Sequence, residues 1–440
     1  MRRIKGLKSL IFDAVEETTN LVERTHENVA KKSVRRFAPI EPLATPARAV
    51  QKIHGTIASI VYSNIRGVNR LVEKAVDLGS GIVADNALVV TGKPEGATPL
   101  RSDSAGSFAW LVDHAEGALN GVVGDYLNRR ENDLDLGMSI RHQGRILPVE
   151  RSAFEKCLPG ATGKVVVFVH GLGCTEWEWS LFAQEYYGDP AVNFGSLLEK
   201  DLGYTPLYVR YNTGRHVSES GRNLSQLLSE MFEAYPRKVK DLILIGHSMG
   251  GLVVRSAAHY AAVNDEPWVR SLSHVFCLAA PNLGAPLEKA ANLLSSVLRI
   301  FDTAGTQVPA QILDTRSAGI KDMRFGYTVD DEWKDRHPDA LLEDNRMNVP
   351  FVEKVAYYFV AATVTQDPAH PLGQLVGDLL VRLPSATGNA SEPARRIPFS
   401  SGSVIGGMNH FHLANHPVVY EVLRRNIKAG RPPSRRRKQA

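Results

Sequence analysis

Residues 241–254 read DLILIGHSMGGLVV, and this stretch decides how the rest of the chain is interpreted. A short apolar run predicts a buried strand, a Gly-His-Ser-Met-Gly turn follows, and the apolar spacing after the turn predicts a helix. A serine in the pattern G-x-S-x-G between a strand and a helix is typical of a nucleophile elbow, a sharp turn that exposes the hydroxyl. Side chains at Gly246 and Gly250 would crowd such a turn, which explains the glycines. We therefore predict that Ser248 is a nucleophile.

The composition is that of an ordinary globular protein. The chain has 440 residues, of which 43% are hydrophobic and 22% charged, so we expect two domains or one domain with large appendages. Its three cysteines are too few for a disulfide framework and are not spaced as metal ligands. The longest apolar runs fall short of the roughly 18 residues of a spanning helix, and acids interrupt the basic N-terminus before a signal-peptide core. These features predict a cytoplasmic location.

The first 130 residues predict a helical N-terminal extension without a catalytic cluster. Apolar residues recur at helical spacing in residues 4–37, 50–75 and 108–127, and prolines separate the first two runs. One interpretation is a helical hairpin that packs on the main domain or on a second copy of the chain; the sequence leaves the oligomeric state open. The alternative is a peripheral contact with membranes or lipid bodies, because Lys and Arg flank the first apolar stripe. Acids interrupt that basic face, which favours the first interpretation.

Strands and helices alternate in residues 137–427. MSIRHQGRILPVE predicts two short strands, and the continuous apolar run 165–169 is typical of a strand buried on both faces. Further strands are predicted in PLYVRYN, DLILIG, HVFCLAA and YYFVAATV, and we expect YYFVAATV (357–364) to be the last. Buried strands that alternate with helices predict a mostly parallel sheet with helices on both faces. Ligands bind at the carboxyl ends of such strands, where the candidate residues fall.

The acid and the base are expected after the last predicted strand. A serine needs a histidine to take its proton, the histidine needs a carboxylate to hold its tautomer, and the order here should be serine, acid, histidine. Two carboxylates compete for the acid: Asp367 directly follows the strand, and Asp378 lies in a later loop before an apolar run. At this point the residues alone leave both open.

Three histidines in GGMNHFHLANHP compete for the base. We favour His410, which directly follows a Gly-rich loop. His416 precedes a proline at the predicted start of the final helix and is expected to be structural. His412 fits either role.

An oxyanion hole needs two backbone N–H groups aimed at the developing charge. One is expected from Met249, the residue after the nucleophile. We expect the other from Leu172 in the His-Gly-Leu-Gly loop after the strand at 165–169, because flanking glycines let the backbone approach the substrate. His170 is expected to orient this loop rather than to transfer protons.

Five motifs occur in a telling order: VFVHGLG, GHSMGG, LAAPNLGAP, GDLLV with PSA, and NHFHLANHPVVYEVL. Together they resemble α/β-hydrolase lipases and esterases, above all bacterial triacylglycerol-lipase-like proteins and the related PGAP1-like GPI inositol-deacylase group. The resemblance covers about residues 137–427. It implies an α/β-hydrolase fold with Ser248, Asp378 and His410 as the triad. The family pattern usually has glycine after the aspartate, where this chain has Leu379.

Two further segments bear on the substrate. The insertion at about 287–350 lies where lipases carry a lid, and an apolar helical pattern in it suits a lipid-like acyl chain; packing on the sheet explains the pattern equally well. Trp177 and Trp179 are candidates for an acyl pocket or for the core. The basic tail at 428–440 predicts disorder, and we expect no specific nucleic-acid binding.

The sequence therefore predicts a serine carboxylic-ester hydrolase of the lipase or esterase type, acting on lipid-like or other apolar esters. It would form an acyl-enzyme on Ser248 and use neither a metal nor an organic cofactor. Two alternatives stay open: an acyltransferase with the same triad, and a non-catalytic lipid-associated scaffold that kept the fold. The predicted location is cytoplasmic, with peripheral lipid contact if the N-terminal helices bind it.

Overall fold

The computed structural model describes residues 134–285, 317–334 and 344–430, together with 113, 116, 117, 120, 121 and 123–132. The chain divides into two compact units, Met1–Ala118 and Leu119–Ala440, and the second contains the sheet. The predictions for the first two N-terminal helices, for the apolar helix of the insertion and for nearly all of the basic tail lie outside the described residues.

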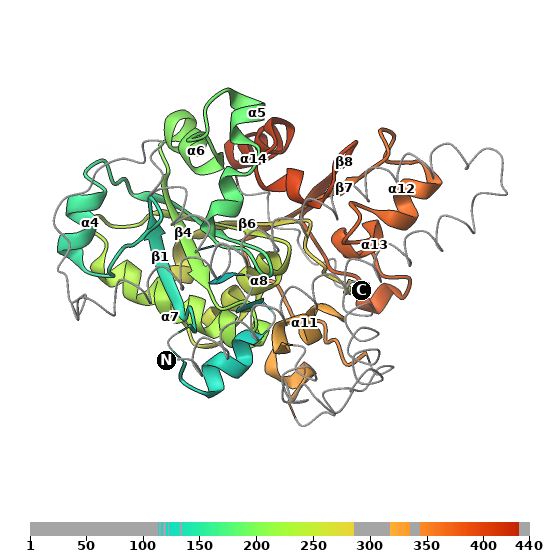
Figure 1. Cartoon of the computed structure of the whole chain (residues 1–440), viewed down its shortest axis with the longest axis horizontal. Coiled ribbons are helices and arrows are strands. Elements are labelled where there is room, and N and C mark those ends of the chain that lie inside the picture. The colour runs from blue at the N-terminus through green and yellow to red at the C-terminus, as the bar shows by residue number, and fades with distance from the viewer. Residues whose placement is uncertain are drawn as a thin grey trace, which may run out of the picture. The chain divides into compact units, whose positions relative to one another are not determined.

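A sheet of eight strands forms the centre of the second unit, in the order β2-β1-β4-β3-β5-β6-β7-β8 (Figure 1). Strands β3 to β8 are parallel, whereas β1 pairs antiparallel with both β2 and β4. The strand bounds are β1 Met138–His142, β2 Arg145–Ile146, β3 Lys164–Val169, β4 Thr205–Tyr211, β5 Asp241–His247, β6 Leu272–Leu278, β7 Ala356–Thr363 and β8 Ser401–Gly406. The mostly parallel sheet expected from the sequence is confirmed.

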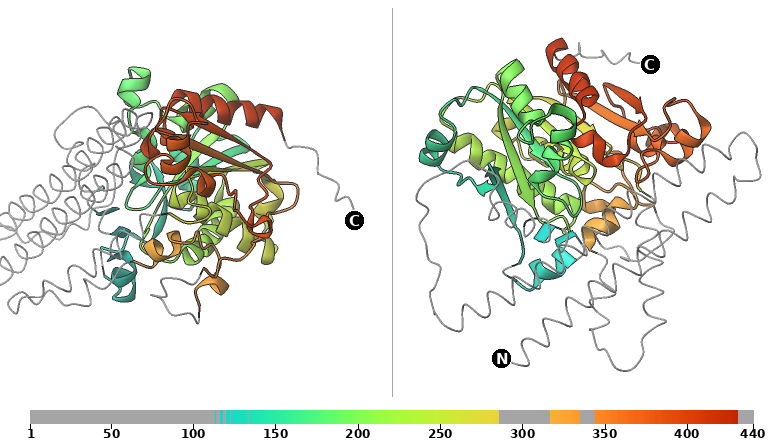
Figure 2. Two further views of the ribbon diagram at one scale, coloured as in Figure 1. Left: turned by 90° about the vertical axis from the view of Figure 1, so that its right-hand side faces the viewer. Right: turned by 45° about the horizontal axis from the view of Figure 1, so that its top comes forward.

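Helices cover both faces of this sheet (Figure 2). On one face α4, α7 and α8 pack on a core that includes Val165 and Val167, and on the other α6 and α14 pack on Val166 and Phe168. Neighbouring residues of β3 thus serve opposite layers, which is why its apolar run is continuous. The helices are α4 Arg151–Cys157, α5 Ala183–Tyr187, α6 Phe194–Leu202, α7 Val217–Ala234, α8 Met249–Val263, α11 Ala318–Met323, α12 Pro371–Val376, α13 Leu383–Ala386 and α14 Pro417–Ala429. The 3-10 helices are η1 Glu176–Ser180, η2 Pro267–Ser271, η3 Asp330–Glu332, η4 Pro393–Arg395 and η5 His410–Ala414.

The prediction that YYFVAATV is the last strand is wrong. β8 follows it in the chain and lies parallel to β7 at the edge of the sheet. Its sequence, SGSVIG, is exposed or half-buried throughout and lacks the continuous apolar run that marks β3, β5 and β6. A Cβ atom on Gly402 would lie 2.2 Å from a ring carbon of Phe359, so a glycine is needed here for the ring to pack. The same glycine weakens the strand pattern in the sequence.

The strand order and the turn after β5 are those of the α/β-hydrolase fold. None of the helices in the described ranges is long and apolar enough to cross a membrane.

Candidate active site

Ser248 occupies the turn between β5 and α8 in a strained backbone conformation. Its φ is +53° and its ψ is −123°, a region that residues other than glycine rarely adopt. A Cβ atom on Gly246 would lie 2.2 Å from the carbonyl oxygen of Gly250, and one on Gly250 would lie 2.1 Å from that of Val169. Both glycines are therefore required by close backbone approach, and Ser248 is held half-buried at the carboxyl end of β5.

The loop after β3 passes directly beside this serine. A Cβ atom on Gly171 would lie 3.0 Å from the Cβ of Ser248. The N–H groups of Gly171, Gly173 and Cys174 donate to Glu178, Thr213 and the carbonyl of Gly171, respectively. None of these three bonds uses the N–H of Leu172, the predicted donor of the loop.

The second predicted donor, Met249, is the first residue of α8. The N–H groups of a first helical turn have no partner inside the helix, and the helix dipole places positive potential there. An anion beside Ser248 would therefore meet a favourable field.

His410 and Asp378 form a buried pair, and the backbone of His410 is bound to His247, the residue before Ser248. Nδ1 of His410 lies 2.8 Å from Oδ2 of Asp378, and the two residues are 3% and 1% exposed. The other carboxylate oxygen accepts the N–H groups of Leu380 and Val381 at 3.0 and 2.8 Å. The structure thus brings His410 to Asp378, whereas Asp367 is exposed and binds the N–H of Ala369.

Leu379, the residue after Asp378, has a strained backbone conformation. Its φ is +86°, in the region that favours glycine. The glycine usually found at this position therefore has a backbone reason, and this chain keeps the turn around Asp378 with a leucine.

Hydrogen bonds separate the roles of the remaining histidines. His416 caps α14, where its Nδ1 accepts the N–H of Val418, as expected for a structural residue. His412 is half-buried against Phe182 and Asn409. His170 is fully buried, and its ring nitrogens contact the backbone of Gly171 and Tyr211.

Sequence reasoning missed a second buried histidine–carboxylate pair, His247 and Glu178. His247 precedes Ser248, and its Nδ1 lies 2.9 Å from Oε1 of Glu178. Its ring centroid is 4.7 Å from that of His410. Burial raises the pKa of Glu178, but the charge and hydrogen bond of His247 and the N–H of Gly171 outweigh it and lower that pKa to about 2. Burial likewise lowers the pKa of His247, and the Glu178 carboxylate more than reverses this.

Glu178 stands between the two tryptophans of the motif CTEWEW, so a carboxylate in this motif is the one sequence signal for the pair. Trp179 is fully buried against Phe168 and His247, which fits the core alternative. Trp177 is half-buried and lies against Gly144.

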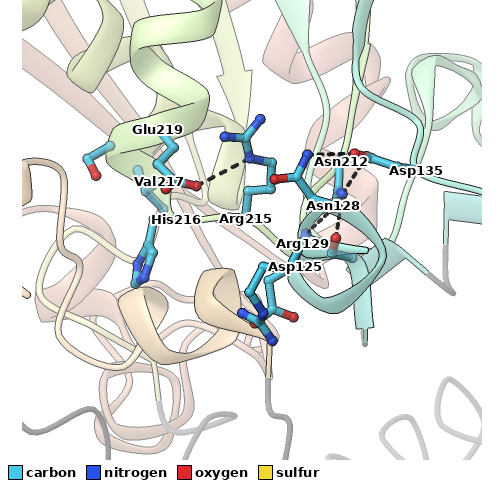
Figure 3. A network of polar contacts seen from close by, with 12 residues as sticks. Asp125, Asn128, Arg129, Asp135, Asn212, Arg215, His216, Val217 and Glu219 are labelled. Carbon is cyan, nitrogen blue, oxygen red and sulfur yellow. Dashed lines mark hydrogen bonds and ion pairs between the residues drawn. The ribbon is translucent and has the colours of Figure 1, made fainter. Parts of the chain in front are cut away.

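The helical residues near 120–129 adjoin the loop that carries Leu172, and Asn212, Asp135 and Asn128 form a polar network beside them (Figure 3). Asn212, after β4, donates to the carbonyl of Gly124 at 2.8 Å and to Asp135 at 2.7 Å. A Cβ atom on Gly121 would lie 2.8 Å from the Cα of Gly173. The helical residues near 120–129 therefore pack against this loop and belong to the unit that begins at Leu119.

Within the described ranges, no three His, Cys, Asp or Glu side chains are grouped to hold a metal ion. A cavity of about 170 Å³ lies apart from Ser248 and is lined by three arginines, Arg255, Arg346 and Arg395, among other residues.

Comparison with known proteins places this site in context. Residues 160–349, less than half of the chain, match the family model of the PGAP1-like alpha/beta domain. The mature lipase BlEst2 of Bacillus licheniformis is 18% identical, with a TM-score of 0.38 over 60% of this chain and 91% of that chain. Phospholipase PlaB of Legionella pneumophila is 17% identical, with a TM-score of 0.36 over 59% of each chain. Naproxen esterase of Bacillus subtilis is 13% identical, with a TM-score of 0.29 over 60% of this chain and 83% of that chain. The sequences of curated proteins give no match.

Proposed function

We propose that this α/β-hydrolase is a serine hydrolase of carboxylic esters. The observation that carries the proposal is the placement of Ser248: a strained turn holds it at the start of α8, with the Gly171 backbone beside it. The pairing of His410 with Asp378 supports it, because a base held by a carboxylate is what a serine hydroxyl needs for attack.

In the proposed reaction, Oγ of Ser248 attacks the ester carbonyl while Nε2 of His410 takes its proton. Asp378 holds the proton on Nδ1 and stabilises the resulting imidazolium. The N–H groups of Leu172 and Met249 bind the oxyanion, and His410 returns the proton to the leaving alcohol. Water then attacks the acyl-enzyme in the same way and releases the carboxylic acid and the free serine.

We further propose apolar acyl groups as substrates, supported by the apolar pattern in the insertion at 287–350. Peripheral contact with lipid through the N-terminal helices stays a proposal as well. Flotation with anionic liposomes tests it, and equal flotation of the full chain and a chain starting at Gly137 would contradict it.

Hydrolysis of short- and long-chain p-nitrophenyl esters by the wild type and by Ser248→Ala tests the reaction. We expect kcat to fall by about 10⁶-fold in the variant, because the covalent route is lost. A fluorophosphonate probe should label the wild type at Ser248 only. Equal activity of the two proteins, or a wild type that the probe does not label, would overturn the proposal. Analysis of the products in the presence of an added alcohol acceptor distinguishes acyl transfer from hydrolysis.

A further inference from the structure

The hydrogen bonds of His247 fix its protonation state. Nδ1 faces the carboxylate of Glu178 at 2.9 Å, and Nε2 faces the backbone carbonyl of His410 at 3.0 Å. Both partners are acceptors, whereas a neutral imidazole can donate from only one nitrogen. The one shared proton, between Nδ1 and Glu178, resides on the imidazole because histidine is the stronger base of the two. His247 is therefore an imidazolium.

His170 differs from His247 in the partners of its two ring nitrogens. Its Nδ1 faces the carbonyl of Gly171 at 3.0 Å, but its Nε2 accepts the N–H of Tyr211 at 3.3 Å. One acceptor and one donor suit a neutral ring. Burial is the largest cause that lowers the pKa of His170, in agreement with a neutral state.

The partners of the charged pair are all parts of the proposed machinery. Oε2 of Glu178 accepts the N–H of Gly171 at 2.8 Å, in the loop beside Ser248. His247 is the residue before Ser248, and its Nε2 holds the backbone of the proposed base. The pair is 2% and 0% exposed, so water does not compete for these bonds.

We propose that the Glu178–His247 ion pair is the positioning device of the site, in which Glu178 fixes the oxyanion loop and the imidazolium of His247 fixes the segment that carries His410. This inference rests on the proposed function. Neither residue touches the reacting atoms; they set the distances among Leu172, Ser248 and His410. Other titratable groups that face the pair are His170, Cys174, Tyr211, Asp378 and His410.

Glu178→Gln separates the charge from the geometry. The amide oxygen can accept the N–H of Gly171, and the amide nitrogen can donate to Nδ1 of a neutral His247, whose Nε2–H still reaches the carbonyl of His410. Glu178→Ala removes both bonds and leaves the Gly171 N–H and the His247 ring without their partner.

Glu176 offers a matched control two residues away. It lies on the same 3-10 helix, is 6% exposed, and pairs with Arg210 at 2.6 and 2.7 Å. Both charges of this pair act on His170 through space, but in the described part of the chain neither Glu176 nor Gly171 donates to or accepts from the other. Glu176→Ala thus breaks a buried ion pair while it leaves the bond between Glu178 and Gly171 in place.

We expect kcat to fall about 10²-fold in Glu178→Ala with KM nearly unchanged, because the loop is misplaced around the transition state. We expect Glu178→Gln to restore kcat to within about tenfold of the wild type, and Glu176→Ala to keep wild-type kcat when active sites are counted with a fluorophosphonate. Equal losses in Glu178→Ala and Glu176→Ala would overturn the positioning role. If Glu178→Ala does not fold, His247→Gln takes its place. Glutamine cannot donate to both the Glu178 carboxylate and the carbonyl of His410, so kcat should fall here as well. Wild-type kcat in His247→Gln would overturn the proposal.

Nitrogen NMR of the histidine rings tests the charge state without any substrate. At neutral pH we expect His247 to show two protonated ring nitrogens in the wild type and one in Glu178→Gln. A neutral His247 in the wild type would overturn the imidazolium. Failure of ester hydrolysis with an intact imidazolium would instead overturn the proposed function, so the two failures are distinguishable.

Discussion

Two buried histidine–carboxylate pairs, His410–Asp378 and His247–Glu178, adjoin through their histidine rings, and they differ in the bonding of the second ring nitrogen. In His410–Asp378, Nδ1 is bound to the carboxylate, and the described residues give Nε2 no hydrogen bond. In His247–Glu178, both nitrogens are bound. In our proposal, the same two chemical groups thus form a proton acceptor in one case and a positioning device in the other. The two pairs differ in how many ring nitrogens of the histidine are hydrogen-bonded, whereas their residue types are similar.

Asp378→Asn should have the largest effect on activity, because it changes which ring nitrogen of His410 carries the proton. Oδ1 of Asp378 is bound by two backbone N–H groups, so the amide nitrogen of asparagine must face Nδ1 of His410. His410 would then carry its proton on Nε2 and could not accept one from Ser248. We expect kcat to fall by about 10⁴-fold. The same change of tautomer in Glu178→Gln should cost at most about tenfold in kcat, because Nε2 of His247 has to donate a hydrogen bond and does not accept a proton.

Ester hydrolysis by both variants, with Asp367→Asn as the control, measures this difference. Asp367 is exposed, so its variant should match the wild type. A large loss in Asp367→Asn with little loss in Asp378→Asn would exchange their assignments.

The sequence predicted one of these pairs and missed the other for a physical reason. Ser248, His410 and Asp378 each follow a recognisable strand or turn, and chain order in this fold restricts their roles. Glu178 lies on a short 3-10 helix in a segment whose tryptophans dominate the pattern, and no local feature marks a carboxylate that is 2% exposed. Its partner, His247, stands inside the motif itself, where it reads as a variable position.

β8 was missed for a related reason. Its glycines and serines carry no apolar alternation, because the strand lies at the edge and packs through the Phe359 ring of its neighbour. Only pairing with β7 makes it a strand, and pairing is a tertiary property.

The pH dependence of stability is the next test of the comparison. The lowered pKa of Glu178 means that its contribution is present above its ordinary value of 4.5 and is lost as the pH falls toward about 2. The raised pKa of His247 means that its contribution is complete below 6.5 and is lost as the pH rises through the raised value. The pair should therefore stabilise the fold most between pH 4.5 and 6.5.

Denaturant unfolding of the wild type and Glu178→Gln across pH measures this contribution. We expect the difference in unfolding free energy to be on the order of 3 kcal/mol in that window and to shrink on both sides. A difference that does not vary with pH would mean that the pair carries no charge.

Gly171→Ala should give the smallest effect on kcat, and it tests how closely the Glu178–His247 ion pair and Ser248 depend on the loop between them. The new Cβ would lie 3.0 Å from the Cβ of Ser248, 3.3 Å from Oε1 of Glu178 and 3.5 Å from Nδ1 of His247. It therefore presses on the nucleophile and on both members of the pair, and a shift of a few tenths of an ångström should lower kcat by about tenfold. Gly160→Ala is the control, since a Cβ there meets no atom within 4 Å. The double variant Gly171→Ala/Glu178→Gln separates the position of the loop from the charge of the pair. Glu178→Gln removes the charge but keeps the hydrogen bonds, so the tenfold loss of kcat caused by Gly171→Ala should remain in the double variant. If this loss of kcat disappears, the charge of the pair, and not the position of the loop, limits the rate.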